Sequence, residues 1–175
     1  CTTYIKNCDN TKDITLNTIV PVSTSGTLNG SGEGFMVGGI IAACYMNNDN
    51  GHTLEVTDCT NSGNVTVQGD YVAKSASRNS IGGICGDYYT YGTVTRCYNS
   101  GEVKFAPSSQ TASVGSINVS FVGGVLGYAA AGQTTIKNCT NGSATDDTKG
   151  EVTFAKAEAG IGIAGIAGLS NLPIQ

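Results

Sequence analysis

The chain repeats one pattern of apolar and polar positions, and each copy contains three short apolar runs. The first run holds a glycine doublet between branched residues, the second places a branched residue three positions before a Cys-x-Asn sequence, and the third alternates apolar and polar residues. The runs recur in this order, the first at 37–40, 81–84, 122–125 and 163–166, the second at 5–10, 56–61, 94–99 and 136–141, and the third at 14–16, 65–67, 103–105 and 152–154. Three signatures in a fixed order predict a repeat architecture.

A single copy, such as residues 81–105, is too short to bury its apolar side chains alone, so copies must stack. In residues 102–105 a period of two sends Val103 and Phe105 inward and the charged residues outward. No segment has the 3.6-residue period of an amphipathic helix. We therefore expect an all-β fold, a right-handed parallel β-solenoid (β-helix) of about four rungs with loop insertions.

Equivalent positions should stack in columns that form the core. The expected columns are Val56, Val94 and Ile136; Cys59, Cys97 and Cys139; and Val65, Val103 and Val152. The doublet glycines indicate a sharp bend or close packing of the backbone. The asparagine after each cysteine tolerates a left-handed turn, and an inward ladder of such asparagines would satisfy its own hydrogen bonds from rung to rung.

The chain is expected to be one repeat domain over residues 1–175, with approximate repeats at 1–34, 35–79, 80–119 and 120–175. Residues 17–34 predict a loop or an irregular extra strand, and about seven added residues near 144–150 predict an insertion in the last repeat. Both ends of the chain fall inside the repeat pattern. We therefore expect a fragment of a longer array.

One pair of segments carries a family resemblance. The sequence Gly-Gly-Ile-Cys-Gly at 82–86, followed by Gly-Thr-Val-Thr-Arg-Cys-Tyr-Asn-Ser-Gly-Glu-Val at 92–103, resembles the GLUG-type repeats of bacterial, notably Bacteroidetes, surface proteins and secreted peptidases. The likeness covers nearly all of residues 1–169, although Ala42 replaces the closing glycine of the first copy and Ala164 replaces a doublet glycine in the last. It implies a surface-exposed β-solenoid segment that flanks or carries another domain.

Charge and composition narrow the classes of partner. Only 13% of residues are charged, and the net charge of −4 gives no electrostatic reason to bind nucleic acid or an anionic membrane. Arg78 and Arg96 are the two arginines, and neither lies in a basic cluster. No apolar stretch is long enough to span a bilayer. The expected location, extracellular or at the cell surface, rests on the resemblance.

Seven cysteines leave two interpretations open. Neighbouring strands lie about 4.8 Å apart, within the Cα range that a disulfide tolerates. Reduced, buried thiols are favoured over bridges, because Cys8, Cys59, Cys97 and Cys139 share one repeat position and Cys85 takes an apolar one. Cys1 also suits a lipoprotein attachment site, a weaker alternative because the repeat begins at once.

The sequence offers few groups for catalysis or metal binding. His52 is the only histidine, so a triad lacks its base, and the cysteines lack Cys-x-x-Cys spacing. Residues 47–51 contain one carboxylate, too few for a calcium loop. We expect no catalytic residue, no metal, no cofactor and no enzyme activity. Asp13, Glu102 and Glu151 occupy equivalent positions; a solvated face is favoured, and a polysaccharide-cleaving β-helix enzyme, or its carbohydrate-binding part, is the alternative.

Aromatic residues follow the glycine-doublet runs. The repeat places these turns on one edge of the stack, where tyrosines stack on sugar rings or anchor a protein partner. Local packing of the loops is the alternative. The candidate ligand-binding residues are Tyr45, Tyr88, Tyr89, Tyr91 and Tyr128. The sequence thus favours a non-enzymatic repeat segment, a structural spacer and possible adhesin. Its expected partners are a glycan or a host or cell-surface protein, together with neighbouring repeats or capping domains of the same chain.

Overall fold

The computed structural model describes residues 1–17, 35–45, 51–73, 78–112, 119–129, 134–143, 145, 149–154 and 161–170. Over this part of the chain every regular element is a strand, and the strands form five parallel sheets of four strands each. The described chain is therefore an all-β parallel solenoid of four rungs, as the repeat predicts. Of the excursion expected at 17–34, residues 18–34 lie outside the described residues, as do residues 46–50.

Each rung contributes one strand to each of five sheets, named A to E in chain order. Sheet A contains β1 (Thr2–Lys6), β6 (Thr53–Thr57), β11 (Gly92–Thr95) and β16 (Thr134–Lys137). Sheet B contains β2 (Asp9–Asn10), β7 (Thr60–Asn61), β12 (Tyr98–Asn99) and β17 (Thr140–Asn141). Sheet C contains β3 (Ile14–Asn17), β8 (Val65–Ala73), β13 (Val103–Ala112) and β18 (Val152–Phe154). Sheet D contains β4 (Met36–Gly38), β9 (Arg78–Gly82), β14 (Val119–Gly123) and β19 (Ile161–Ala164). Sheet E contains β5 (Ile41–Tyr45), β10 (Cys85–Tyr89), β15 (Leu126–Ala129) and β20 (Ala167–Ser170).

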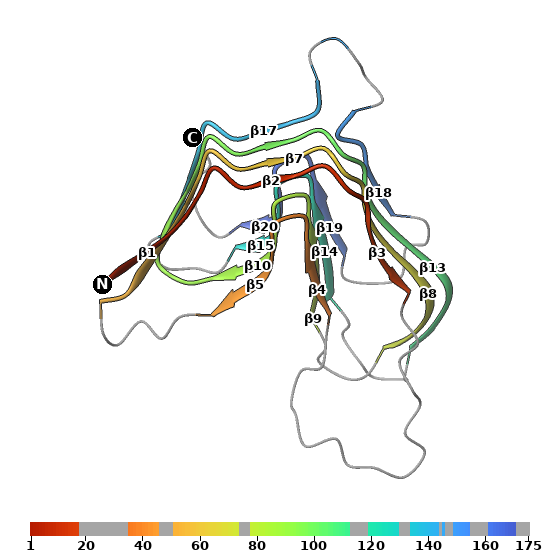
Figure 1. Ribbon diagram of the computed structural model, residues 1–175. Coiled ribbons are helices and arrows are strands. Elements are labelled where there is room, and N and C mark those ends of the chain that lie inside the picture. The colour runs from red at the N-terminus through yellow and green to blue at the C-terminus, as the bar shows by residue number, and fades with distance from the viewer. Residues whose placement is uncertain are drawn as a thin grey trace.

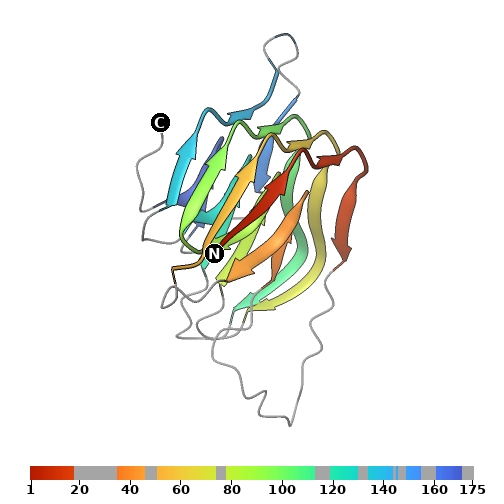
Figure 2. The same ribbon diagram turned by 60° about the vertical axis from the view of Figure 1, so that its left-hand side comes forward.

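The winding is right-handed. Seen from the first rung, the chain runs clockwise through β1, β2 and β3 and then back through β4 and β5 (Figure 1). The turned view in Figure 2 places the red first rung at one side and the blue last rung at the other, so later rungs lie behind the first in Figure 1. A clockwise path that recedes from the viewer is a right-handed coil, the expected hand for parallel crossovers.

The three apolar runs of each repeat become five strands, because two of the runs bend. The Cys-x-Asn run is divided between sheets A and B at a residue in the left-handed region, and this residue precedes the cysteine. These residues are Asn7, Asp58, Arg96 and Asn138, with φ between 51° and 56°. The sequence predicted the left-handed turn at the asparagine that follows the cysteine, and that position is wrong. The glycine doublet separates sheets D and E, and this bend has no residue of positive φ.

Sheets A, B and C form an arch, and sheets D and E fold into it as an inner V (Figure 1). One core lies between sheets A and E and includes Val56, Val94, Ile136 and Tyr88. A second core lies between sheets C and D and includes Val65, Val103 and Phe105. Two of the expected columns are confirmed by in-register pairing, Val56 with Val94 and Ile136, and Val65 with Val103 and Val152. Sheets D and E touch through backbone: a Cβ on Gly86 would lie 2.7 Å from the Val37 nitrogen.

Asparagine side chains of sheet B form a continuous ladder inside the arch. The Asn10 Nδ2 donates to Asn61 Oδ1, Asn61 Nδ2 to Asn99 Oδ1 and Asn99 Nδ2 to Asn141 Oδ1, each at 2.7 Å. Every Nδ2 also donates to a carbonyl of its own rung, at 2.8 Å for Asn61 with Gly63 and for Asn99 with Gly101. The predicted inward ladder is therefore confirmed, and it satisfies amides that are fully buried in the middle rungs.

The glycine doublets form the corner of the V, directly beneath this ladder. A Cβ on Gly83 would lie 2.3 Å from Cγ of Asn99 and 2.1 Å from the Gly124 carbonyl. A Cβ on Gly124 would lie 2.1 Å from Cγ of Asn141. The second glycine of the doublet is therefore required because the ladder of the next rung occupies the space of a side chain.

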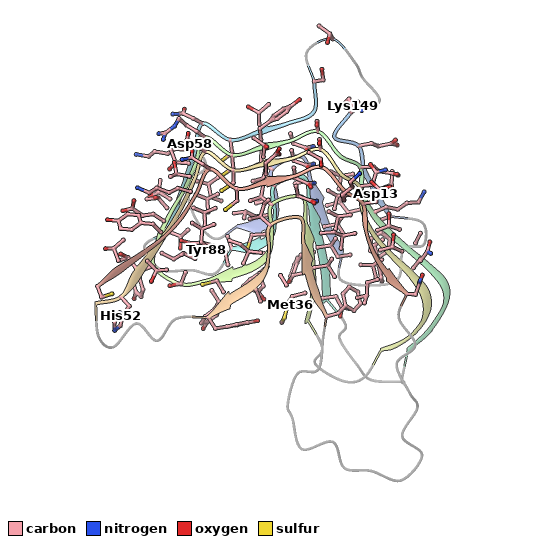
Figure 3. The ribbon with its side chains drawn as sticks, viewed as in Figure 1. Asp13, Met36, His52, Asp58, Tyr88 and Lys149 are labelled. Carbon is pink, nitrogen blue, oxygen red and sulfur yellow. The ribbon has the colours of Figure 1, made fainter. Side chains whose placement is uncertain are left out.

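The two ends of the insertion in the last rung, Gly142 and Gly150, lie together. A Cβ on Gly150 would lie 2.3 Å from the Gly142 nitrogen, so the two ends of the insertion touch. The Gly142 N–H donates to the Asn99 carbonyl and the Gly150 N–H to the Ser100 carbonyl. Val152 consequently keeps its register with Val103. Lys149 marks the return of the insertion in Figure 3.

Phe105 provides a test of the second core. Its side chain is fully buried, and its ring lies 5.6 Å from that of Phe35 and 4.8 Å from that of Phe154. Phe105→Ala should lower the free energy of unfolding by about 3–5 kcal/mol, as measured by denaturant titration. The adjacent outward change Lys104→Ala should cost less than about 0.5 kcal/mol. Equal effects of the two changes would contradict the assignment of Phe105 to the core.

Asn99 provides a test of the ladder. Asn99→Ala removes one acceptor and two donors, and each buried group left unsatisfied costs about 1–3 kcal/mol. The free energy of unfolding should fall by at least about 2 kcal/mol. Asn10→Ala, at the half-buried start of the ladder, is the matched control and should cost less. If Asn10→Ala lowered the free energy of unfolding as much as Asn99→Ala does, burial would not determine how much the ladder stabilises the fold.

Candidate functional site

Two of the five candidate tyrosines form an exposed pair at the end of sheet E. Tyr45 ends β5 and Tyr89 ends β10, and the two residues are in register in adjacent rungs. Their ring centroids lie 5.7 Å apart with planes inclined by 31°. Tyr45 is 53% exposed and Tyr89 is 44% exposed. This tyrosine pair is a two-ring aromatic surface that faces solvent.

The tyrosine pair is supported from below by a buried carboxylate. The Tyr45 hydroxyl donates to Asp87 Oδ2 at 2.9 Å, and Asp87 is completely buried. The same hydroxyl lies 3.7 Å from Sδ of Met36, at the start of β4. The carboxylate thus fixes the Tyr45 ring, whose orientation in turn sets the face that the pair presents. This hydrogen bond orients the Tyr45 ring before any ligand arrives.

Tyr128 flanks this surface in the next rung. It is in register with Asp87 and therefore occupies the row beside the tyrosine pair. Its ring lies 5.3 Å from that of Phe121, which belongs to β14 in sheet D, and it is half-buried. Tyr128 thus continues the aromatic surface along the axis of the stack, with less of its ring exposed.

Tyr88 and Tyr91 do not join the pair. Tyr88 is fully buried in the core between sheets A and E, and its hydroxyl donates to the Leu54 carbonyl at 2.5 Å. Figure 3 shows its side chain pointing into the interior. This corrects the expected position of Tyr88, which is not available to a ligand at the exposed edge. Tyr91 is half-buried between β10 and β11, where its carbonyl accepts from the Leu54 N–H.

Sequence reasoning missed the supporting residues, Asp87 and Met36. Neither lies in a recognisable motif, and nothing in the repeat pattern marks the position of Asp87. The alternation of buried and exposed residues along β10 is also broken, since Cys85 to Tyr88 are all buried and Tyr89 is exposed. No periodic signal in the sequence could therefore have separated Tyr88 from Tyr89.

Two further tyrosines are exposed on other faces of the stack. Tyr4 in sheet A is 55% exposed, and the Lys6 Nζ lies 4.1 Å from its ring centroid. Tyr98 in sheet B is 36% exposed. Neither has a stacked aromatic neighbour among the ring pairs of the described residues. They provide matched single tyrosines with which the tyrosine pair can be compared.

The equivalent acidic positions have structural partners. The Asn64 N–H donates to Asp13 Oδ1 at 2.8 Å, and the Glu102 N–H donates to Asn64 Oδ1 at 2.9 Å. Glu102 Oε1 accepts from the Thr153 hydroxyl at 3.1 Å and lies 3.6 Å from the Lys104 Nζ. Asp13 and Asn64 thus accept from a backbone N–H of the following rung, and Glu102 accepts from a hydroxyl there; Figure 3 shows Asp13 on the outer surface. The contacts favour the solvated face over an acid–base pair.

The cysteines of the second run stack along the first core as free thiols. The Sγ of Cys59 lies 3.4 Å from the Thr57 carbonyl, that of Cys97 3.6 Å from the Thr95 carbonyl and that of Cys139 3.5 Å from the Lys137 carbonyl. The contact with Cys139, together with burial, raises the pKa of Cys97 well above that of a free thiol. The thiols of the middle rungs are therefore inward, protonated and shielded.

The remaining candidates lie apart from one another. His52 is half-buried beside Gly51. Within the described ranges, no three His, Cys, Asp or Glu side chains gather as a set of metal ligands. Most of segment 47–51, whose single carboxylate is too few for a calcium loop, lies outside the described residues. A search of the described residues finds no helix of the length and apolarity that crossing a membrane requires.

Comparison of the chain with protein-family models, with curated proteins and with solved structures finds no match. The resemblance to GLUG-type repeats therefore stays a prediction. A role for the tyrosine pair and for Asp87 must therefore be inferred from their geometry.

The thiol column predicts an order of chemical reactivity. Cys97 should react slowly with an alkylating reagent in the native protein, because it is buried and mostly protonated at neutral pH. Exposed Cys1 should react quickly, and the half-buried Cys139 of the last rung should follow it. Mass spectrometry of peptides from a labelling time course measures these rates. Labelling of Cys97 as fast as that of Cys1 would contradict the inward column.

Proposed function

We propose that the chain is a non-enzymatic, surface-exposed or secreted solenoid segment that acts as a spacer and binds glycans through the tyrosine pair. The observation that carries this proposal is the pair itself, two adjacent exposed rings of which one, Tyr45, is held by a hydrogen bond to the buried Asp87. The free protein has little reason to hold an exposed aromatic ring in place with a buried side chain. Binding of a ligand supplies that reason.

The chemistry of the surface suits a sugar ring. Tyrosine presents a flat apolar face to the C–H groups of a pyranose and a hydroxyl that bonds sugar hydroxyls, so one side chain meets both surfaces of a carbohydrate. Exposed aromatic faces also anchor protein partners, but protein interfaces need a broad area with a well-packed centre. Two rings beside a half-buried third match a short run of sugar units better. The net charge of −4 disfavours anionic polymers.

The spacer role follows from the stack. Each rung adds about 4.8 Å along the axis, and its neighbours hold it by five parallel ladders and an asparagine ladder. The ends of the insertion between Gly142 and Gly150 lie together, and Val152 beyond it keeps its register with Val103. Loop sequences on the surface can therefore vary while the stacked rungs keep their structure. Weak sites repeated along such a rod gain affinity through multivalency.

A glycan array tests the binding part of the proposal. The native chain should bind a subset of glycans, and the double variant Tyr45→Ala/Tyr89→Ala should weaken that binding by at least about tenfold, equivalent to about 1.4 kcal/mol. The matched control is Tyr4→Ala/Tyr98→Ala, which removes two exposed tyrosines from sheets A and B and should leave the profile unchanged. Calorimetric titration with the best glycan gives the affinities.

The outcomes separate the parts of the proposal. Equal weakening by the two double variants would contradict the assignment of the site to sheet E. Absence of binding to any glycan by the folded native chain would reject the binding role and leave the spacer role. Cleavage of an arrayed polysaccharide by the native chain would contradict the non-enzymatic role.

A further inference from the structure

Six of the seven cysteines lie in or against the core between sheets A and E. Four of these six stand at the corner between sheets A and B, one in each rung, and form the thiol column Cys8, Cys59, Cys97 and Cys139. The N–H of the residue after each of the last three cysteines donates to the carbonyl of the cysteine in the preceding rung, at 2.9 Å. Neighbouring members of the thiol column are therefore one rung apart, about 4.8 Å along the stack.

The sulfur atoms of the thiol column take the same position in successive rungs. Those of the last three cysteines each lie 3.5–3.8 Å from a backbone carbonyl of the preceding rung. Neighbouring thiols are close enough to hydrogen-bond, Cys59 with both Cys8 and Cys97, and Cys97 with Cys139. The thiol column is thus an unbroken row of four sulfur atoms, and all four are free thiols.

The spacing of this row suits one kind of metal ion. Thiolate sulfur is a soft ligand that selects soft cations such as Cu(I). The bond from a thiolate to a d10 ion is about 2.3 Å long, so an ion placed on the line between two sulfur atoms needs a separation of about 4.6 Å. The rung spacing of about 4.8 Å supplies that separation. Consecutive sulfur atoms therefore have the geometry of a linear, two-coordinate site.

A two-coordinate ion needs only neighbours within the thiol column. Among the residues that the structure describes, no three His, Cys, Asp or Glu side chains gather around one point, whereas a structural zinc ion needs four ligands. A linear ion needs two, and each neighbouring pair offers two. Cys59 and Cys97 show the arrangement in the middle rungs, where both are buried and a rung lies on either side of each. The arrangement is therefore independent of what precedes or follows the described chain.

The charge balance also favours a monovalent ion. A buried charge is costly unless it is neutralised, and a metal ion binds thiols by displacing their protons. When one monovalent ion replaces one thiol proton, an S–H bond is broken, a bond from the ion to that thiolate forms, and the neighbouring sulfur donates a lone pair to the ion. Three ions fill the three gaps between four sulfur atoms and release three protons. One sulfur keeps its proton, so the net charge of the core does not change.

We propose that the thiol column binds soft monovalent cations, Cu(I) or Ag(I), with one ion between each pair of neighbouring sulfur atoms. The column lies at the corner of sheets A and B, whereas the tyrosine pair lies at the end of sheet E. The proposal is therefore independent of glycan binding.

Native mass spectrometry of the full chain with silver nitrate in chloride-free buffer counts the bound ions. Cys1→Ser is the background for every measurement, because the exposed Cys1 thiol would bind an ion by itself. This chain should bind three Ag(I) ions and keep its β fold, as monitored by circular dichroism. X-ray absorption at the silver edge should find two sulfur neighbours for each ion. Cu(I), added without oxygen, should bind in the same number.

The number of ions lost on substitution should depend on the place of the removed thiol in the column. Cys97→Ala removes a sulfur that borders two gaps, so it should leave one ion. Cys139→Ala removes a sulfur that borders one gap, so it should leave two. Cys139 is only half-buried, so this variant keeps the test available if Cys97→Ala does not fold. The matched control is Cys85→Ala, which removes a fully buried thiol of the same core outside the column and should leave three.

Four outcomes would overturn the proposal. The first is a folded chain that binds no Ag(I), and the second is a Cys85→Ala variant that loses as many ions as Cys97→Ala does. The third is three or four sulfur neighbours for each ion. The fourth is binding of Zn(II) that Cys97→Ala abolishes, because it would show that the column supplies a site with more than two ligands.

Discussion

The structure depends on burying one asparagine per rung against a glycine corner. An amide in a dry interior is costly unless all its groups are bonded, and here each Nδ2 bonds both its own rung and the next. The corner glycine of one rung and the asparagine of the next must therefore lie together, as Gly83 and Asn99 do. This requirement sets the register between rungs. The ladders of the five sheets, the two cores and the thiol column follow from it.

The inner V explains how a chain with few large side chains fills an arch. Sheets D and E contact each other through glycine backbone at the corner. The other face of sheet D packs on sheet C, and the other face of sheet E packs on sheet A, which gives two separate cores. Two narrow cores need only valine, isoleucine, cysteine and an occasional aromatic residue. The free ends of the V then point away from sheet B, which places the ends of β5 and β10 at the surface (Figure 1). The tyrosine pair is therefore a consequence of the same packing that makes the corner.

The candidate site could be predicted from the sequence pattern only in part. The sequence grouped Tyr45, Tyr88, Tyr89, Tyr91 and Tyr128 by their position after the glycine runs, and the structure brings Tyr45 and Tyr89 together with Tyr128 beside them. Tyr88 instead lies in the core between sheets A and E, where the Leu54 carbonyl of sheet A accepts a hydrogen bond from the Tyr88 hydroxyl. Asp87 was not predicted, since its value depends on the nearness of a tyrosine from another rung.

Local periodicity was sufficient for everything that repeats. Because neighbouring rungs are in register, equivalent residues must stack, and the sequence alone therefore determined the parallel solenoid, the columns of Val94 and Val103 and the ladder through Asn99. It did not determine the five-sheet cross-section: Asn7, Asp58 and Asn138 are of types that favour the left-handed region, but Arg96 is not, and asparagine occurs at many other positions of the chain. Nor did it determine which side of sheet E is covered. An alternation of apolar and polar residues shows that the two faces of a strand differ. Which residues each face contacts depends on how sheets D and E fold into the arch.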